Sequence, residues 1–284
     1  MTMRPPFHES NTQFAFQLRF HFCFATHSRQ EIFSHGANRD KLTSTLGKVC
    51  DSSGYHLLES SIETQLVRTL ISLSPNDSPS AVVKTLKANI SRLYRLEVPD
   101  ETKLRCQTQT WSRGYFFRSV GEMMLESVNQ YIAGQRDHHA GHVRVLAEYF
   151  NPASEQLLAE RSFTHSAGQY NIHLVLCPVR HVPAIDEFLA EPLLKYFLTV
   201  AERRGFGMVR IAILEDHVHF LVALPPTLSP AIVAFAIMNN SSHWIGKRNP
   251  GLFRVWDVPG FWSASAYLGT VGDVTSRHVR NFLK

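Results

Sequence analysis

Hydrophobic and polar positions follow the same order twice along this chain. Each time, an extended apolar segment comes first, a helix-like stretch follows, and a strand-like segment comes third. These three segments span residues 17–26, 40–53 and 56–73 in the first half, and residues 170–179, 186–204 and 207–224 in the second. Such patterning is the main sequence signal for secondary structure. It predicts a unit that mixes strands and helices and occurs twice.

Each half then closes with a helix, a short strand and a last helix. Ser78-Pro79 and Ser229-Pro230 suit the start of the first of these helices, because serine caps a helix and proline fits its first turn. A strand beginning with Trp-Ser follows, and the last helices are expected at 122–135 and 273–284. The sequence thus predicts an α+β fold in which helices pack on an antiparallel sheet, built twice.

A fixed offset relates the two halves residue by residue. SPSAVV at 78–83 corresponds to SPAIVA at 229–234, an offset of 229 − 78 = 151 residues, and Trp111-Ser112 meets Trp262-Ser263 at the same offset. A long match at one offset indicates an internal duplication. We expect one repeat at 12–138, a short helical connector at 139–167 and a second repeat at 168–284, here called the leading half, the connector and the trailing half.

Composition narrows the function classes only slightly. A hydrophobic content of 44% can supply a buried core, and a net charge of +5 favours a polyanionic partner such as nucleic acid. The four cysteines lie far apart without a CxxC pair, which argues against a zinc knuckle or a disulfide framework. No apolar run reaches the roughly 20 residues of a membrane span. We therefore expect a folded cytoplasmic protein with no membrane partner.

The segment LEDHVHFLVAL at 214–224 carries the first candidate chemistry. Side chains alternate along a strand, so His217 and His219 should share one face while Val218 and Phe220 pack on the other. By the same alternation Asp216 should point away from the histidines and serve the structure. Two imidazoles on one face can share a divalent cation. The alternative is a pair of histidines that merely sits on a half-exposed strand.

The context of this segment resembles a known family. DHVHFLVALPP is followed by a helix, by WSASAYLGTVG and by a terminal helix. This order is similar to the HUH-type single-tyrosine transposases of insertion sequences and REP elements, across nearly all of the trailing half and more loosely across the leading half. The resemblance implies two ferredoxin-like units and single-stranded DNA, including hairpin-containing strands, as the partner. It also implies Mg²⁺ or Mn²⁺ held by the two histidines.

In that family a tyrosine on the last helix attacks a phosphodiester and leaves a 5′-phosphotyrosine and a free 3′-OH. A glutamine one turn beyond the tyrosine completes the metal site. Transferred to this chain, the tyrosine and glutamine positions of the leading half are Tyr131 and Gln135, but its histidine positions are Leu66 and Arg68. The trailing half keeps His217 and His219 but has Phe282 at the tyrosine position and ends before the glutamine. Neither half is complete.

The two defects are complementary. Family members of the insertion-sequence type work as dimers with shared sites, so a fused pseudo-dimer would contain two composite sites. One site would combine Tyr131 as nucleophile with His217, His219 and Gln135 as metal ligands, and the degenerate second site would contain Leu66, Arg68 and Phe282. We therefore expect a monomeric enzyme that nicks single-stranded DNA and transfers the strand. Tyr267, in the same half as the histidines, is a rival nucleophile, although its position in the WSxxxY strand favours packing.

Basic residues of the leading half are the candidate DNA contacts. The helix after Ser78 places Lys84, Lys87 and Arg95 near one face, and Arg92 of the same helix is a further candidate. Arg68 could hold a backbone phosphate in the degenerate site. An ordinary solvated helix face and a surface arginine are the respective alternatives.

Two other functions remain open at the level of sequence. One is a catalytically inactive, transposase-derived DNA-binding protein, in which the histidines are remnants. The other is a metal-dependent nuclease that uses water in place of tyrosine.

Overall fold

The computed structural model describes residues 13–97, 109–121, 125–133, 144–251 and 260–275, together with positions 279 and 281. The elements of the leading half are β1 (Gln13–Gln17), β2 (Arg19–Ala25), η1 (His27–Arg29), α1 (Gly36–Ser53), β3 (His56–Ile62), β4 (Leu66–Ser72), α2 (Pro79–Glu97), β5 (Tyr115–Val120) and α4 (Leu125–Ala133). The connector contributes β6 (Val145–Phe150), α6 (Ser154–Leu158) and β7 (Arg161–Phe163). The trailing half contains β8 (Ser166–Gln169), β9 (Asn171–Pro178), η2 (Val179–His181), α7 (Glu187–Arg204), β10 (Gly207–Leu214), β11 (Val218–Ala223), α8 (Pro230–Arg248) and β12 (Trp262–Val271).

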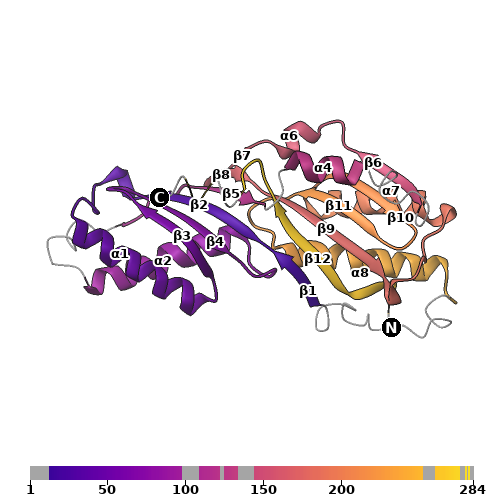
Figure 1. Ribbon diagram of the computed structural model, residues 1–284, viewed down its shortest axis with the longest axis horizontal. Coiled ribbons are helices and arrows are strands. Elements are labelled where there is room, and N and C mark those ends of the chain that lie inside the picture. Colours follow the sequence, from indigo (N-terminus) through magenta and orange to yellow (C-terminus); the bar gives the residue numbers. More distant parts are fainter. Residues whose placement is uncertain are drawn as a thin grey trace.

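Two sheets lie side by side along the long axis of the molecule (Figure 1). The leading sheet has the strand order β3-β4-β2-β5-β8-β7, and the trailing sheet has the order β1-β12-β9-β11-β10-β6. Helices α1 and α2 pack together on the leading sheet, as α7 and α8 do on the trailing sheet (Figure 1). The predicted α+β fold, built twice, is confirmed.

Helix starts follow the serine-proline signal. Ser229 caps α8 by accepting a hydrogen bond from the Ile232 amide, and the Ser78 hydroxyl accepts one from the Ala81 amide at the start of α2. No helix among the described residues is both long and apolar enough to cross a membrane.

Two predictions of local structure were wrong. The segments 56–73 and 207–224, each expected as one strand, are antiparallel hairpins, β3-β4 and β10-β11. Each hairpin turns without glycine or proline, at Glu63–Gln65 and at Glu215–His217, so the turns carry no strong sequence signal. The described part of the connector is mostly strand rather than helix, because β6 pairs with β10 and β7 pairs with β8.

The two halves exchange strands. β1 of the leading half pairs in parallel with β12 of the trailing sheet, and β8 of the trailing half pairs in parallel with β5 of the leading sheet. Both crossings come directly before a central strand, β2 or β9, so each half extends its first strand into the other sheet (Figure 1). Parallel neighbouring strands need long connections. Here the paired strands lie in different repeats, so the chain between them is long enough.

Two hydrogen bonds across the junction are equivalent to each other at the repeat offset. The Ser119 hydroxyl donates to the Val271 carbonyl at 2.6 Å, and the Thr270 hydroxyl donates to the Val120 carbonyl at 2.8 Å. Gly272 lies at the same contact, where a Cβ would stand 2.2 Å from the Ser119 carbonyl oxygen. The halves are therefore related by a pseudo-twofold axis that runs through the junction.

Hydrophobic packing also continues across the junction. The rings of Phe20 and Tyr170, from different halves, lie 5.2 Å apart edge to face, and both side chains belong to one buried cluster that spans the molecule. The two repeats thus share one core.

The last helix of the leading half lies on the other half's sheet. Val128 and Ile132 of α4 are buried against the trailing sheet, where they meet Leu221 and Val271. This is the sheet face opposite α7 and α8. On the leading sheet, Val279 of the trailing half is buried against Leu70 and Val120, the equivalent positions at the repeat offset. The exchange of these terminal segments brings side chains of both halves together on one sheet face.

Candidate active site

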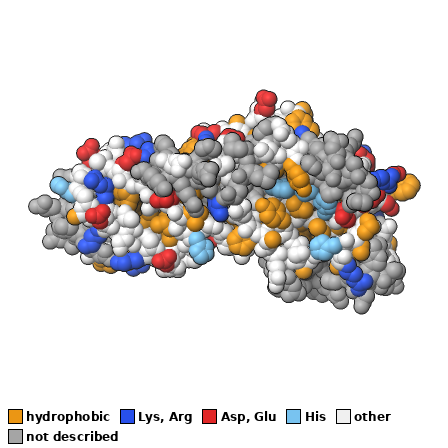
Figure 2. Space-filling view, viewed as in Figure 1, with side chains coloured by type: hydrophobic (Ala, Val, Ile, Leu, Met, Phe, Trp, Pro, Cys, Tyr) orange, Lys and Arg blue, Asp and Glu red, His pale blue; other side chains and the backbone are white. Residues whose placement is uncertain are grey.

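The histidine pair lies at the start of β11 on the face that α4 covers. Val218 and Phe220 point into the core on the other side of the sheet, as the predicted alternation requires. His219 is buried, with 4% of its surface exposed, and His217 precedes the first strand residue. The two Nε2 atoms face each other at 3.0 Å. Figure 2 shows histidine side chains gathered on this half of the molecule.

The Nδ1 atom of each imidazole contacts a further side chain. His217 Nδ1 lies 2.6 Å from Asp216 Oδ1, and His219 Nδ1 lies 3.0 Å from His173 Nε2. The expectation that Asp216 points away from the histidines was wrong. Asp216 belongs to the β10-β11 turn and not to the strand, so strict alternation does not govern its direction. Such outer partners fix the tautomer and the orientation of a ligating histidine.

His173 is a site residue that the sequence analysis missed. It lies on β9, and its ring stacks on His219 with centroids 5.2 Å apart. Burial lowers its pKa to about 4, so the ring is neutral at physiological pH. A neutral imidazole can either donate or accept through Nε2, depending on the tautomer. The available signal was a histidine at the matching position of both extended segments, since His21 of β2 is its counterpart when the one-residue slip is included.

Tyr131 reaches this site from the leading half. Val128 and Ile132 anchor α4 on the sheet, and the tyrosine lies next to Ile132 with 37% of its surface exposed. Its ring meets the His219 ring edge to face, with centroids 5.5 Å apart and an interplanar angle of 88°, and it lies 6.5 Å from the His173 ring. A tyrosine and a histidine pair from different repeats therefore share one surface within a single chain.

Tyr267, the rival nucleophile, also borders the site. Its ring lies 5.7 Å from that of His173, and burial raises its pKa. Its phenol folds back over its own strand, because a Cβ built on Gly269 would meet the Tyr267 hydroxyl at 2.5 Å. This position is one strand removed from the histidine pair, since β9 lies between β12 and β11.

The histidine pair fits a divalent cation. An octahedral ion holds neighbouring ligands at a right angle, so two ligand atoms at about 2.1 Å from it lie about 3.0 Å apart. The Nε2 separation matches this value. Among the described residues, no group of three or more His, Cys, Asp or Glu side chains is placed to hold a metal ion. The expected third ligand, Gln135, lies outside the described residues.

The residues expected to form the degenerate site fall at the equivalent place on the leading sheet. Leu66 and Arg68 begin β4, and Arg68 forms an ion pair with Glu63 in the preceding turn. Phe282 lies outside the described residues.

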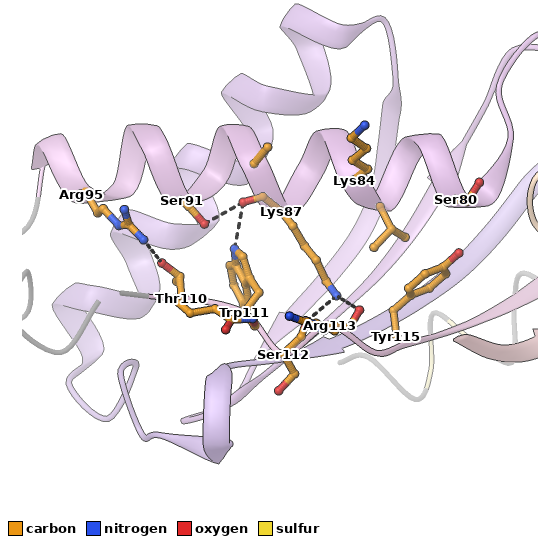
Figure 3. A pocket seen from close by; sticks show the side chains of 13 residues that line it. Ser80, Lys84, Lys87, Ser91, Arg95, Thr110, Trp111, Ser112, Arg113 and Tyr115 are labelled. Carbon is orange, nitrogen blue, oxygen red and sulfur yellow. Dashed lines mark hydrogen bonds between the residues drawn. The ribbon is translucent and has the colours of Figure 1, made fainter. Parts of the chain in front are cut away.

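The basic residues of α2 differ from one another in their surroundings. Lys84 and Arg92 are exposed, whereas the Lys87 ammonium donates to the backbone carbonyls of Ser112, Arg113 and Gly114 at 2.9, 3.2 and 2.8 Å. Arg95 donates to the Thr110 hydroxyl. Figure 3 shows Lys87 reaching across to this backbone. Much of the Lys87 charge is therefore engaged within the protein.

Lys84, Lys87 and Arg95 border one pocket of about 470 Å³ between α2 and the Trp111 segment (Figure 3). In the trailing half the residue equivalent to Lys84 is Phe235, whose ring packs against Phe14 of β1 at 5.5 Å. The equivalent surface is thus covered by an aromatic contact in one half and bordered by cations in the other.

A sequence model of the IS200-like transposase family matches this chain twice, at residues 14–135 and 166–284. Among curated proteins, none matches the chain significantly. Two transposases among the matching solved structures show weak overall similarity. A candidate transposase from Deinococcus radiodurans is 23% identical over 42% of this chain and 90% of its own, with a TM-score of 0.34. A REP-associated tyrosine transposase bound to a REP hairpin is 9% identical over 50% of this chain and 74% of its own, with a TM-score of 0.28.

The two sequence matches together cover most of the chain and fall on the two halves that exchange their strands and terminal segments. The chain therefore belongs to the IS200-like transposase family, as a tandem duplication of the family's domain within one polypeptide.

Proposed function

We propose that this protein nicks and rejoins single-stranded DNA at one composite site, with Tyr131 as nucleophile and His217 and His219 as metal ligands. The observation that supports this proposal most directly is the ring contact at 5.5 Å between Tyr131 and His219, residues of different repeats. A tyrosine that served packing alone would have no need to meet a histidine pair at a partly exposed surface. The proposed repeat boundaries are 12–138 and 168–284.

The covalent step balances as a simple exchange of ester bonds. The Tyr131 oxygen forms a bond to phosphorus and loses its phenolic proton, while the bond from phosphorus to the 3′ oxygen breaks and that oxygen gains a proton. The product is a 5′-phosphotyrosine and a free 3′-OH. The reverse reaction rejoins the strand without a nucleotide cofactor, because the phosphotyrosine bond conserves the energy of the broken linkage.

A divalent cation, Mg²⁺ or Mn²⁺, would polarise the phosphate and stabilise charge on the leaving oxygen. The chain would hold it through the Nε2 atoms of His217 and His219, with Gln135 as the third protein ligand. Asp216 and His173 support this arrangement by binding the opposite nitrogens of the two rings. With its Nδ1 bonded to Asp216, His217 is left with a lone pair on Nε2, the atom that faces its partner.

Substrate binding would combine this site with basic residues of the leading half. Lys84, Arg92 and Arg95 lie along one helix and are suited to backbone phosphates, which carry most nonspecific affinity for DNA. Because both contributors to the site belong to one chain, the protein would act as a monomer. The proposed location is the cytoplasm.

The test is covalent trapping on the intact chain. A pool of single-stranded oligonucleotides, with and without a hairpin, is labelled at the 3′ end and incubated with the protein and Mn²⁺. We expect a denaturation-resistant adduct that mass spectrometry maps to Tyr131. Cleavage without an adduct would indicate a nuclease that uses water, and DNA binding without cleavage would indicate an inactive DNA-binding protein. An adduct at Tyr267 would also overturn the proposal.

A further inference from the structure

The degenerate site on the leading sheet contains two arginines where the candidate active site has a metal ligand and a glycine. At the repeat offset, Arg68 replaces His219 and Arg118 replaces Gly269. Their strands flank β2, on which Cys23 pairs with Arg68 and His21 pairs with Arg118. These registers match those of His219, His173 and Gly269 on the trailing sheet. The substitutions therefore fall on the same patch of the same sheet face.

Both guanidinium groups act on one histidine. His21 is the counterpart of His173, and burial together with the charges of Arg68 and Arg118 lowers its pKa to about 4. Among the described residues, no hydrogen-bond partner reaches the buried His21 Nε2. The leading site thus joins two permanent cations to a neutral ring nitrogen that still lacks a partner, whereas the trailing site presents neutral nitrogens suited to a cation.

Each arginine is paired with a carboxylate that solvent reaches. Arg68 contacts Glu63, and Arg118 lies 3.6 Å from Glu160, beyond hydrogen-bond distance. The two glutamates are about half exposed, at 50% and 49%, whereas the arginine side chains are only 21% and 28% exposed. Exposed ion pairs contribute little stability. A phosphate could therefore displace these carboxylates, and they could turn into water while the arginines stay in place.

The pseudo-twofold relation between the halves indicates which kind of ligand the two arginines would bind. In the proposed function, a DNA phosphate lies beside the His219 position of the trailing sheet, and the axis relates that place to Arg68. We propose that the degenerate site is a metal-independent phosphate clamp, in which Arg68 and Arg118 hold an uncleaved segment of the single-stranded DNA. The inference rests on the proposed function for the DNA, but it assigns to the leading sheet a role that needs neither metal nor tyrosine.

Binding measured in EDTA separates the clamp from catalysis. Fluorescence anisotropy with a single-stranded oligonucleotide would compare the intact protein with the Arg68→Gln/Arg118→Gln variant over a range of salt concentrations. Each phosphate contact on single-stranded DNA contributes about 0.7 to the slope of log affinity against log salt. We expect the double variant to lose roughly 1.4 from this slope. The Arg203→Gln/Arg204→Gln variant, with the same charge change at the exposed end of α7, should keep the slope.

The outcomes distinguish this inference from the proposed function. If the arginine variant binds with the same slope as the intact protein, while the intact protein forms the Tyr131 adduct, the clamp is wrong and the function stands. If the slope falls although no adduct forms in the intact protein, the clamp stands without the catalysis. An equal loss in both double variants means that only net charge matters, which overturns the clamp. Arg68→Lys/Arg118→Lys keeps the charge and should retain most of the slope. If it does, the loss in the glutamine variant is due to the missing charges and not to a change of fold at these positions.

Discussion

The phenol ring of Tyr131 lies edge to face with the imidazole of His219, at a centroid distance of 5.5 Å. The two residues come from different repeats, and α4 must cross onto the trailing sheet to bring them together. Exchange of terminal segments between the halves therefore decides which tyrosine meets which histidines.

Replacing Tyr131 with phenylalanine removes only the hydroxyl and should leave the ring contact with His219 in place. We expect adduct formation to fall by roughly 10³-fold or more, because phenylalanine has no hydroxyl to attack the phosphate, while affinity for DNA in EDTA stays within a few-fold. Quantifying the adduct on denaturing gels provides the measurement. Tyr267→Phe is the matched control. An equal loss of adduct in this variant would contradict the assignment of the nucleophile to Tyr131.

His173 should act as a positioning residue through His219 Nδ1. Removal of an outer hydrogen-bond partner commonly weakens metal affinity about 10–100-fold. We therefore expect His173→Ala to shift the Mn²⁺ concentration needed for half-maximal adduct formation by that factor, with a much smaller effect at saturating Mn²⁺. His173→Gln, which can still donate or accept, should recover part of the affinity. A fall in the rate that added metal does not relieve would argue against a positioning role.

The docking of α4 depends on Ile132, which is fully buried on the trailing sheet. Truncating a buried isoleucine to alanine costs about 2–5 kcal/mol through lost burial and the cavity that remains. We expect Ile132→Ala to loosen α4 first, which hydrogen exchange of the helix amides would reveal, and to reduce adduct formation even though no catalytic group changes. Unaltered exchange together with full activity would contradict the proposed role of the helix.

His21 should make the leading half sensitive to acid. Its pKa is lowered to about 4 in the folded chain, against 6.5 for an ordinary histidine, so the unfolded chain binds more protons between these values. This contribution to stability is present above pH 6.5 and is lost as the pH falls towards 4. Urea unfolding at pH 7 and pH 5 should show a smaller decrease for His21→Gln than for the intact protein. Equal decreases would mean that His21 is not protonated on unfolding in this range.

The duplication and the alternation of Val218 with His219 could be predicted from sequence because both are periodic features. The paths of β1 and β8 could not, because a strand pattern does not tell which sheet the strand joins. The hairpin turns at Glu63–Gln65 and Glu215–His217 lack glycine and proline, so the pattern predicts one strand where each hairpin lies and gives the wrong direction for Asp216. The match of His173 with His21 is a weak sequence signal, because it does not show that His173 lies beside the histidine of the adjacent strand.

Mixing two inactive proteins tests the central claim, a site completed within one chain. Tyr131→Phe removes the proposed nucleophile and His217→Ala removes a proposed metal ligand, so each variant alone should form no adduct, while the intact protein run in parallel does. We expect an equimolar mixture to form no adduct either, because α4 docks on the trailing sheet of its own chain. Recovery of adduct in the mixture, with DNA linked to Tyr131 of the His217→Ala protein, would show that the site forms between chains and not within one.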